Sequence, residues 1–360
     1  MTISFSRRDA IRTFAAVPAL SLASPLPATR PVDTYMRTAL HCIERSDMPP
    51  PRAAYALALF SRGLADAHTI ARRLGLPTNR ALAGAVGILL PALFPLARGV
   101  IAFPTASPGP AALAAERILA NAAPAARPAF EAPVVGEPAA GVWQPTPHKY
   151  SAGLLPAWGT MPTFGKPLDL APPPSWDSAA FAATRAAFAD TQATLADDGR
   201  ALAQRWDYGT GTVTPVGAWY RIALSTAAAA QLDETATIQL YATLGEVLHD
   251  TLVVCWRAKY QYRVARPVQW LPAQLPGWWP TIETPPHPSY PSGHAAISAA
   301  AAAVIGAAVT LETARLRRLA LDAAHSRVVG GIHWPIDAMA GLALGRTVAS
   351  QALAARRTAV

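Results

Sequence analysis

Apolar residues recur at helical spacing over much of this chain. Between residues 179 and 206 they follow one another at intervals of seven, at Phe181, Phe188, Leu195 and Leu202. This spacing places all of them on one helix face. Similar faces predict further helices at about 235–265, 294–309, 311–325 and 336–356. No strand-like alternation of useful length competes, so the pattern predicts an all-α fold, a helical bundle.

Proline-rich stretches separate these helical patterns. We interpret them as long loops, at residues 48–52, 107–112, 170–177 and 284–293. The apolar stretch at 81–97 contains Pro91 and Pro95 and is shorter than the ~20 residues of a membrane span, so it predicts a buried helix. We divide the chain into an N-terminal helical and loop region, residues 29–170, that packs on a catalytic helical bundle, residues 171–360.

Composition narrows the class of protein. The chain has 360 residues, 52% of them hydrophobic, which is typical of a globular protein. Lys and Arg exceed Asp and Glu, 31 against 22, but only three of the basic residues are lysines: Lys149, Lys166 and Lys259. Solvated surface arginines account for this balance, and an anionic ligand is the alternative. No long basic run occurs, which argues against a nucleic-acid partner.

The two cysteines, Cys42 and Cys255, lie far apart and form no metal-binding spacing. Cys255 falls in a predicted buried helix, where a free thiol is more common than a disulfide. The sequence therefore favours neither a zinc site nor a disulfide scaffold.

The first 28 residues are typical of a twin-arginine export signal. Arg7 and Arg8 are paired, a short apolar stretch follows at residues 14–23, and small residues suited to cleavage come next. We expect the protein to be exported already folded, to the periplasm or the medium, which suits an enzyme that carries a cofactor. An ordinary amphipathic N-terminal helix is the alternative.

A first motif lies near the end of the helix predicted at 235–265, in the sequence CWRAKYQYRVARP. Lys259 and Arg266 are seven residues apart, which places both on one helix face, about 10 Å apart along the axis. Pro267 ends the helix and leaves Arg266 free to turn into a cavity. Two cations on one face repel each other unless an anion lies between them. A solvated basic helix end is the alternative.

A second motif, PSGH at residues 291–294, opens the next predicted helix. Ser292 supplies a hydroxyl, and Gly293 has no Cβ to keep an oxyanion away from the backbone amide. The positive end of the helix dipole adds to the same spot, and His294 places an acid or base beside it. This pattern predicts an anion site, with a capped helix and an incidental histidine as the alternative.

A third motif lies in HSRVVGGIHWPIDAM, residues 325–339. Arg327 offers a planar fork that suits a tetrahedral oxyanion, and a Gly-Gly bend precedes His333. Asp337 lies four residues after His333, where it can hold the imidazole in one tautomer if the segment is helical. The alternative is a structural Arg–Asp pair with a buried histidine.

Taken together, the motifs supply five donors to one tetrahedral oxyanion: Lys259, Arg266, Ser292, Gly293 and Arg327. The imidazoles of His294 and His333 can divide the roles of acid and of ligand or nucleophile. In this order the motifs resemble the signature of the superfamily that joins type 2 phosphatidic acid phosphatases and other acid phosphatases to vanadium-dependent haloperoxidases. The resemblance covers residues 259–337.

The resemblance implies one of two activities. In a phosphatase, His333 would form a phosphohistidine, Asp337 would orient it, and His294 would protonate the leaving group. In a haloperoxidase, His333 would bind the vanadium of vanadate, the five donors would hold its oxygens, and His294 would assist hydrogen peroxide. Phosphate would then be a competitor of the vanadate cofactor.

Neighbouring residues resemble the haloperoxidase branch more closely. They include Trp256 and the string TPPHPSYPSGH, in which His287 occupies a position linked to halide choice. The segment RWDYGTGTVTP resembles the one that supplies a partner for the third-motif arginine, here Asp207 for Arg327. We therefore expect a vanadate-dependent haloperoxidase that oxidises bromide or iodide with hydrogen peroxide. A soluble acid phosphatase and a non-catalytic oxyanion-binding protein are the alternatives, with an organic acceptor or a phosphate ester as a further partner.

Overall fold

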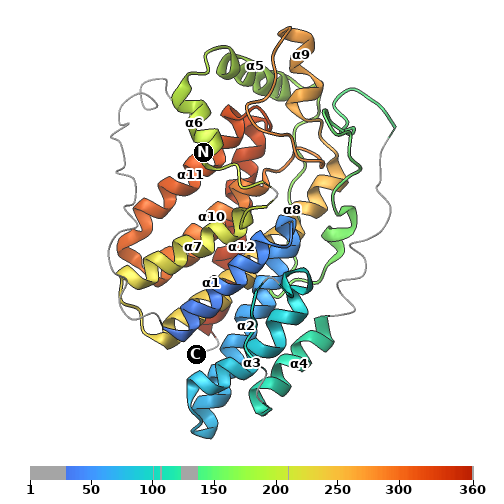
Figure 1. The fold of residues 1–360 in the computed structure, drawn as a ribbon. Helices are drawn as coiled ribbons and strands as arrows, with labels where there is room; N and C mark the ends of the chain where they lie inside the picture. Colours follow the sequence, from blue (N-terminus) through green and yellow to red (C-terminus); the bar gives the residue numbers. More distant parts are fainter. Residues whose placement is uncertain (1–29, 100, 106–107, 123–136, 210, 359–360) are drawn as a thin grey trace.

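The computed structural model describes residues 30–99, 101–105, 108–122, 137–209 and 211–358. Throughout these ranges the regular structure is α-helical, with short 3-10 turns and no strand beyond two isolated bridges (Figure 1). The predicted all-α fold is confirmed. The twin-arginine signal predicted at residues 1–28 lies outside the described residues.

The helices are joined by short turns in the N-terminal part and by longer connections around the top of Figure 1. In chain order they are α1 (Pro31–Glu44), α2 (Pro50–Leu74), α3 (Thr78–Leu93), α4 (Pro110–Ala122), α5 (Ala179–Ala193), α6 (Asp197–Arg205), α7 (Thr214–Ala229), α8 (Glu234–Tyr262), α9 (Leu271–Gln274), α10 (Gly293–Ala308), α11 (Thr313–Val329) and α12 (Pro335–Thr358).

The central helix is α10, which packs against α8, α11 and α12. Its approach to α12 depends on two glycines, because a Cβ at Gly341 would overlap the carbonyl oxygen of Ser292 and one at Gly345 would overlap that of Ala296. This close contact lets the backbone amide of Ser292 donate to the carbonyl of Asp337, at 3.0 Å. The second and third motifs are thereby fixed against each other.

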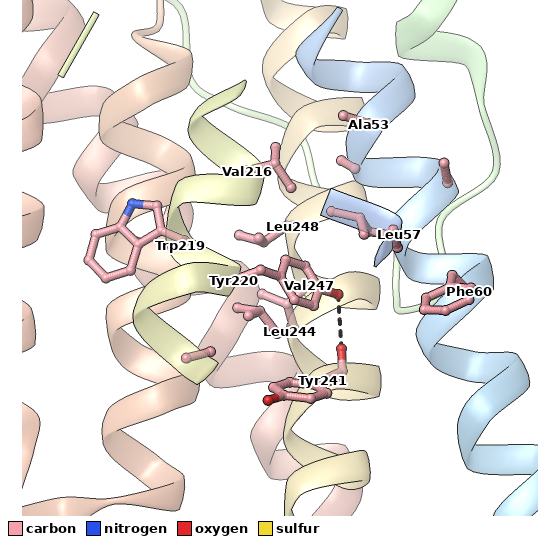
Figure 2. Packing of buried hydrophobic residues seen from close by; sticks show 14 of the residues in the cluster. Ala53, Leu57, Phe60, Val216, Trp219, Tyr220, Tyr241, Leu244, Val247 and Leu248 are labelled. Atoms are coloured by element: carbon pink, nitrogen blue, oxygen red, sulfur yellow. Dashed lines mark hydrogen bonds between the residues drawn. The ribbon is translucent and has the colours of Figure 1, made fainter. Parts of the chain in front are cut away.

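The N-terminal helices extend the same core. α2 packs along α8 and α3, and α7 lies beside both α2 and α8 (Figures 1 and 2). Within this layer the Tyr220 hydroxyl donates to the backbone oxygen of Tyr241 at 3.0 Å, as Figure 2 shows. One cluster of buried apolar side chains runs from Val32 on α1 to Ala349 on α12. The bundle that carries the motifs is thus buttressed along one side by residues 30–97.

Most of the predicted helices are confirmed within four residues at their ends, as α8, α10, α11 and α12 show. The stripe through residues 179–206 is wrong as a single helix. The chain leaves the helix at Thr194 and begins α6 with Asp197 and Asp198 in its first turn, where acidic side chains favour a new helix start. Two prolines that lie in predicted loops instead begin helices, Pro50 in α2 and Pro110 in α4. Proline is tolerated there because the first turn of a helix makes no use of the backbone N–H that proline lacks.

The apolar stretch at 81–97 forms most of α3 and a 3-10 turn at Pro95–Ala97, with a largely buried face. Among the described helices, none is both long and apolar enough to cross a membrane. Cys42 on α1 and Cys255 on α8 are buried and unpaired.

Candidate functional site

The three motifs come together where the end of α8, the start of α10, the end of α11 and the start of α12 meet. The side chains of Lys259, Arg266, Arg327, His333 and Asp337 are at most 2% exposed, which is unusual for charged groups. Direct contacts join them across the motifs, from Arg266 to His333 at 3.1 Å and from Arg327 to His294 at 3.0 Å. Residues as far apart in sequence as Arg266 and His333, 67 positions, are therefore in contact within one buried polar cluster.

The first motif does not have the predicted helical geometry. α8 ends at Tyr262, and Arg263 closes it in the left-handed conformation, with φ of 47°. Arg266 therefore lies beyond the helix in extended backbone, as expected for a residue before proline. The prediction that Lys259 and Arg266 share one helix face is wrong, although both side chains turn into the same interior.

Lys259 is bound entirely by the loop that leads into PSGH. Its Nζ donates to the backbone oxygens of Pro288 at 2.8 Å, Ser289 at 2.9 Å and Pro291 at 2.6 Å. An ammonium group has three hydrogens, so these bonds use all of its donors. In this structure Lys259 contributes to an oxyanion site through its charge and by holding the loop.

Arg266 connects two histidines. Its Nη1 donates to the backbone oxygen of Ile332 at 2.5 Å and lies 3.1 Å from Nε2 of His333. Its Nε and Nη2 reach the backbone oxygen and Nδ1 of His287, both at 2.9 Å. Because guanidinium only donates, His333 Nε2 must accept and carries a lone pair. His287 Nδ1 lies between this donor and the backbone oxygen of Pro288, 3.1 Å away, which can only accept.

His333 is held in one tautomer. Since its Nε2 accepts, its Nδ1 carries the proton and donates to Oδ2 of Asp337 at 3.0 Å. The same carboxylate oxygen accepts from the Trp334 amide at 3.0 Å and from the Ser289 hydroxyl at 2.5 Å. His333 itself precedes α12, so the predicted contact forms without both residues being helical.

The other imidazole, His294, has two competing partners. Its Nε2 lies 3.0 Å from Nη1 of Arg327 and 3.1 Å from the backbone oxygen of Trp206. Arg327 can only donate and the carbonyl can only accept, so this nitrogen cannot satisfy both at once. His294 is thereby placed to hold or release a proton at Nε2.

Arg327 retains one donor without a partner. Its Nη1 donates to the oxygen of Trp206 at 3.0 Å and its Nη2 to that of Ala203 at 3.3 Å, whereas its buried Nε has no hydrogen-bond partner. Its predicted partner Asp207 lies 3.9 Å from Nη2 with a side chain that is 46% exposed. This pair is a long contact at the edge of the site, and the uncommitted Nε is a ready donor for a ligand.

Ser292 and Gly293 form the start of α10. The Ser292 hydroxyl caps the helix by accepting from the Ala295 amide at 3.4 Å. A Cβ placed on Gly293 would lie 3.7 Å from the Trp256 ring and 3.9 Å from the Cys255 sulfur. The glycine therefore leaves a methyl-sized space against α8, beside the positive end of the helix dipole.

His287 and Trp256 lie side by side at the same cluster. Their ring centres are 5.0 Å apart, and the indole nitrogen of Trp256 donates to the backbone oxygen of Leu154 at 3.1 Å. Burial, with the positive charges of Lys259 and Arg266 beside it, lowers the pKa of His287 well below its ordinary value. His287 is accordingly a neutral ring that lines the site next to an aromatic wall.

The electrostatics of the cluster favour an anion. Three buried cations, Lys259, Arg266 and Arg327, face one fully buried carboxylate among the described residues, Asp337. Burial lowers the pKa of Arg266 to about 9 and that of Arg327 to about 10. These shifts mean that positive charge is costly here without a counter-ion, which a bound oxyanion would supply.

Burial also keeps both catalytic candidates neutral. It lowers the pKa of His333 well below 6.5, with the charges of Arg266 and Lys259 as further causes. The pKa of His294 is lowered in the same way, first by burial and then by Arg327. A neutral imidazole with a free lone pair is the form that can act as a nucleophile or bind a metal.

Sequence reasoning missed two features of the site. Ser289, which binds Asp337, was part of the quoted string TPPHPSYPSGH but received no role. The backbone oxygens of Ile332, Trp206 and Ala203 bind the arginines, and backbone contacts leave no trace in residue type. A separate cavity of about 510 Å³ lies between α2, α4 and residues 162–164, and no motif residue lines it.

Comparison with known proteins shows similarity in sequence and in fold. Residues 236–359 match the sequence model of the PAP2 superfamily, and a search of curated proteins finds no match. A bacterial vanadium-dependent iodoperoxidase structure has 20% sequence identity and a TM-score of 0.71, covering 92% of this chain and 97% of that chain. The holo form of a bacterial vanadium-dependent chloroperoxidase has 12% identity and a TM-score of 0.64, covering 92% and 98%.

The superfamily resemblance inferred from the motifs is therefore confirmed, and the chain has the fold of these haloperoxidase structures. The family match contains all three motifs, since it extends from before Lys259 to beyond Asp337.

Proposed function

We propose that this protein is a vanadate-dependent haloperoxidase that uses hydrogen peroxide to oxidise bromide or iodide to hypohalous acid. The observation that carries the proposal is the buried cluster of three cations against one carboxylate, with a partnerless Arg327 Nε and a lone pair on His333 Nε2. Such a cluster calls for an anion that accepts hydrogen bonds and also bonds to an imidazole nitrogen.

Vanadate fits the residues present. Its oxygens would accept from the Nε of Arg327 and from the start of α10, at the methyl-sized space left by Gly293. Its central atom would bond to Nε2 of His333, the nitrogen that the Nδ1–Asp337 hydrogen bond leaves unprotonated. To reach that nitrogen it would replace the hydrogen bond from Arg266, whose Nη1 would then donate to the anion instead.

When bound, vanadate supplies Lewis acidity that activates hydrogen peroxide toward a halide. The chain supplies everything around that chemistry. Arg266 and Arg327 hold negative charge in a buried site where their fields are strong. His294, with its Nε2 between Arg327 and a carbonyl, is placed to accept a proton from peroxide and return it to the leaving oxygen. His287 and Trp256, whose rings lie side by side, would face the halide. The preference for bromide or iodide over chloride rests on the resemblance, in which a histidine stands at this position.

A soluble acid phosphatase is the second candidate. The neutral His333 imidazole, hydrogen-bonded to the Asp337 carboxylate, favours it equally. An imidazole with its Nδ1 proton on a carboxylate is an activated nucleophile, able to form a phosphohistidine while His294 protonates the leaving alkoxide. The similarity of the whole fold to vanadium-dependent haloperoxidases, over 92% of this chain, supports the first candidate.

One paired assay separates the candidates. Purified protein is tested for bromination of monochlorodimedone with hydrogen peroxide, with and without orthovanadate, and for hydrolysis of p-nitrophenyl phosphate without vanadate. We expect bromination that requires vanadate. Phosphate-ester hydrolysis inhibited by vanadate, without bromination, would establish the phosphatase instead. Anion binding with neither activity would indicate a non-catalytic binding protein.

We also propose that the protein is exported through the twin-arginine pathway. The support is the Arg7–Arg8 pair followed by a short apolar stretch. In a bacterial host, replacing both arginines by lysine should retain the protein in the cytoplasm. Unchanged export of this double variant, measured by fractionation, would contradict the proposal.

A further inference from the structure

Ser289 contacts both the first and the third motif through its hydroxyl and its backbone. Its side chain is fully buried, and its hydroxyl donates to Oδ2 of Asp337 at 2.5 Å. Its backbone oxygen accepts from Lys259 at 2.9 Å, and its amide donates to the backbone oxygen of Val264 at 2.9 Å. The serine thus links the first motif to the carboxylate of the third.

The two oxygens of Asp337 are treated very differently. Oδ2 accepts three hydrogen bonds, from Ser289, His333 and the Trp334 amide, whereas the buried Oδ1 has no hydrogen-bond partner. A carboxylate free to rotate would turn its oxygens away from the imidazole and lose the hydrogen bond to Nδ1 of His333. With the Trp334 amide on one side and the Ser289 hydroxyl on the other, Oδ2 is fixed toward Nδ1 of His333.

We propose that Ser289 is a positioning residue that fixes the Asp337 carboxylate and through it supports, from the Nδ1 side, the His333 tautomer whose Nε2 lone pair also faces Arg266. The inference rests on the proposed oxyanion function of His333. The hydroxyl also lies 3.4 Å from His333 Nδ1, so its loss would leave Oδ2 of Asp337 with the Trp334 amide as its one remaining contact besides the imidazole. Ser289 touches no reacting atom and acts only through Asp337.

The loop that contains Ser289 does not depend on this hydroxyl for its position. The loop is already held by backbone bonds of Ser289, which a substitution to alanine would keep. Loss of the hydroxyl should therefore leave the fold intact while it loosens the carboxylate. A comparable serine elsewhere gives the control, since Ser61 on α2 is equally buried and bonds Tyr220 at 3.0 Å, outside the three motifs.

The test compares Ser289→Ala with Ser61→Ala by two measurements made without peroxide. Nitrogen-15 NMR of the His333 ring, assigned with a His333→Gln variant, reports which ring nitrogen is protonated. Calorimetry reports the affinity for orthovanadate. In Ser289→Ala we expect a mixture of tautomers and about tenfold weaker vanadate binding, the scale of one hydrogen bond to a charged group. Ser61→Ala should change neither.

A Ser289→Cys variant, of similar shape but with a weak donor, should fall between wild type and Ser289→Ala, and it carries the test if the alanine variant does not fold. Unchanged ring resonances and unchanged affinity in the variants would overturn the inference. If the wild-type protein binds no vanadate, the proposed function fails, and the ring resonances still decide whether Ser289 sets the tautomer.

Discussion

The two ends of the oxyanion site hold their histidines in opposite ways. At the His333 end, a fully buried carboxylate accepts a hydrogen bond from Nδ1 and Arg266 donates to Nε2, so both ring nitrogens have one assigned role. At the His294 end, one nitrogen lies between Arg327 and a carbonyl oxygen, and the carboxylate next to Arg327, that of Asp207, is 46% exposed.

Under the proposed function, this difference suits the two histidines to two different roles. A fixed lone pair suits a ligand or nucleophile, which must present the same atom in every turnover. A nitrogen with alternative partners suits an acid–base group, because either protonation state finds a partner nearby. Burial lowers the pKa of both rings, so hydrogen-bond geometry and not charge separates their roles.

The largest effect should come from the fixed end. His333→Ala removes the only atom proposed to bond to the central atom of the anion, so we expect loss of bromination and of phosphatase activity by about 10⁴-fold or more. The control is His249→Ala, which removes another fully buried histidine outside the motifs and should retain activity. Activity that survives in His333→Ala would refute the site as assigned.

A smaller effect is expected for Arg327, because only its Nε lacks a protein partner. Arg327→Ala should weaken phosphate binding by about 2 kcal/mol, roughly 30-fold, at the low end of the cost of breaking a buried charged contact. Arg327→Lys should recover only part of this loss, since an ammonium cannot donate from the Nε position. Calorimetry with inorganic phosphate measures both, and unchanged affinity would contradict the donor role.

The sequence was sufficient to predict those features of the molecule that depend on residue type. Helical spacing located α8, α10, α11 and α12, and motif chemistry named the charged residues that the fold gathers. It failed at the end of α8, where Arg263 adopts a left-handed backbone that no periodicity encodes. It also failed for Ser289, because an oxygen 48 residues away in the chain gives that serine its role.

The contacts of the cations were equally hidden from the sequence. Lys259 was expected to donate to the anion, yet backbone oxygens of the loop that leads into α10 take all three hydrogens. Backbone carbonyls are present at every residue, so composition cannot show which ones turn toward a buried charge.

The smallest effect tests the open end, at Asp207. Its carboxylate lies near Arg327 without orienting it, since backbone oxygens hold both Nη atoms of Arg327. Asp207 should therefore act on the anion mainly by repulsion, and Asp207→Asn should bind phosphate about threefold more tightly, the scale of a solvent-screened charge pair. Weaker binding would mean that Asp207 orients Arg327 after all.

The pH dependence gives the sign of this effect a second check. Burial raises the pKa of Asp207, and Glu283 raises it further against the opposing charge of Arg327. Above that raised pKa the wild-type carboxylate is charged, and wild type and Asp207→Asn should differ in their affinity for phosphate. As the pH falls through this pKa, the carboxylate is neutralised and the ratio of the two affinities should approach one. The titration of phosphate itself affects both proteins alike and cancels in the ratio.

Asp169→Asn is the matched control, because Asp169 pairs with Arg257 at 3.2 Å with a side chain that is 89% exposed. A ratio that stays constant with pH would show that the charge of Asp207 does not act on the anion.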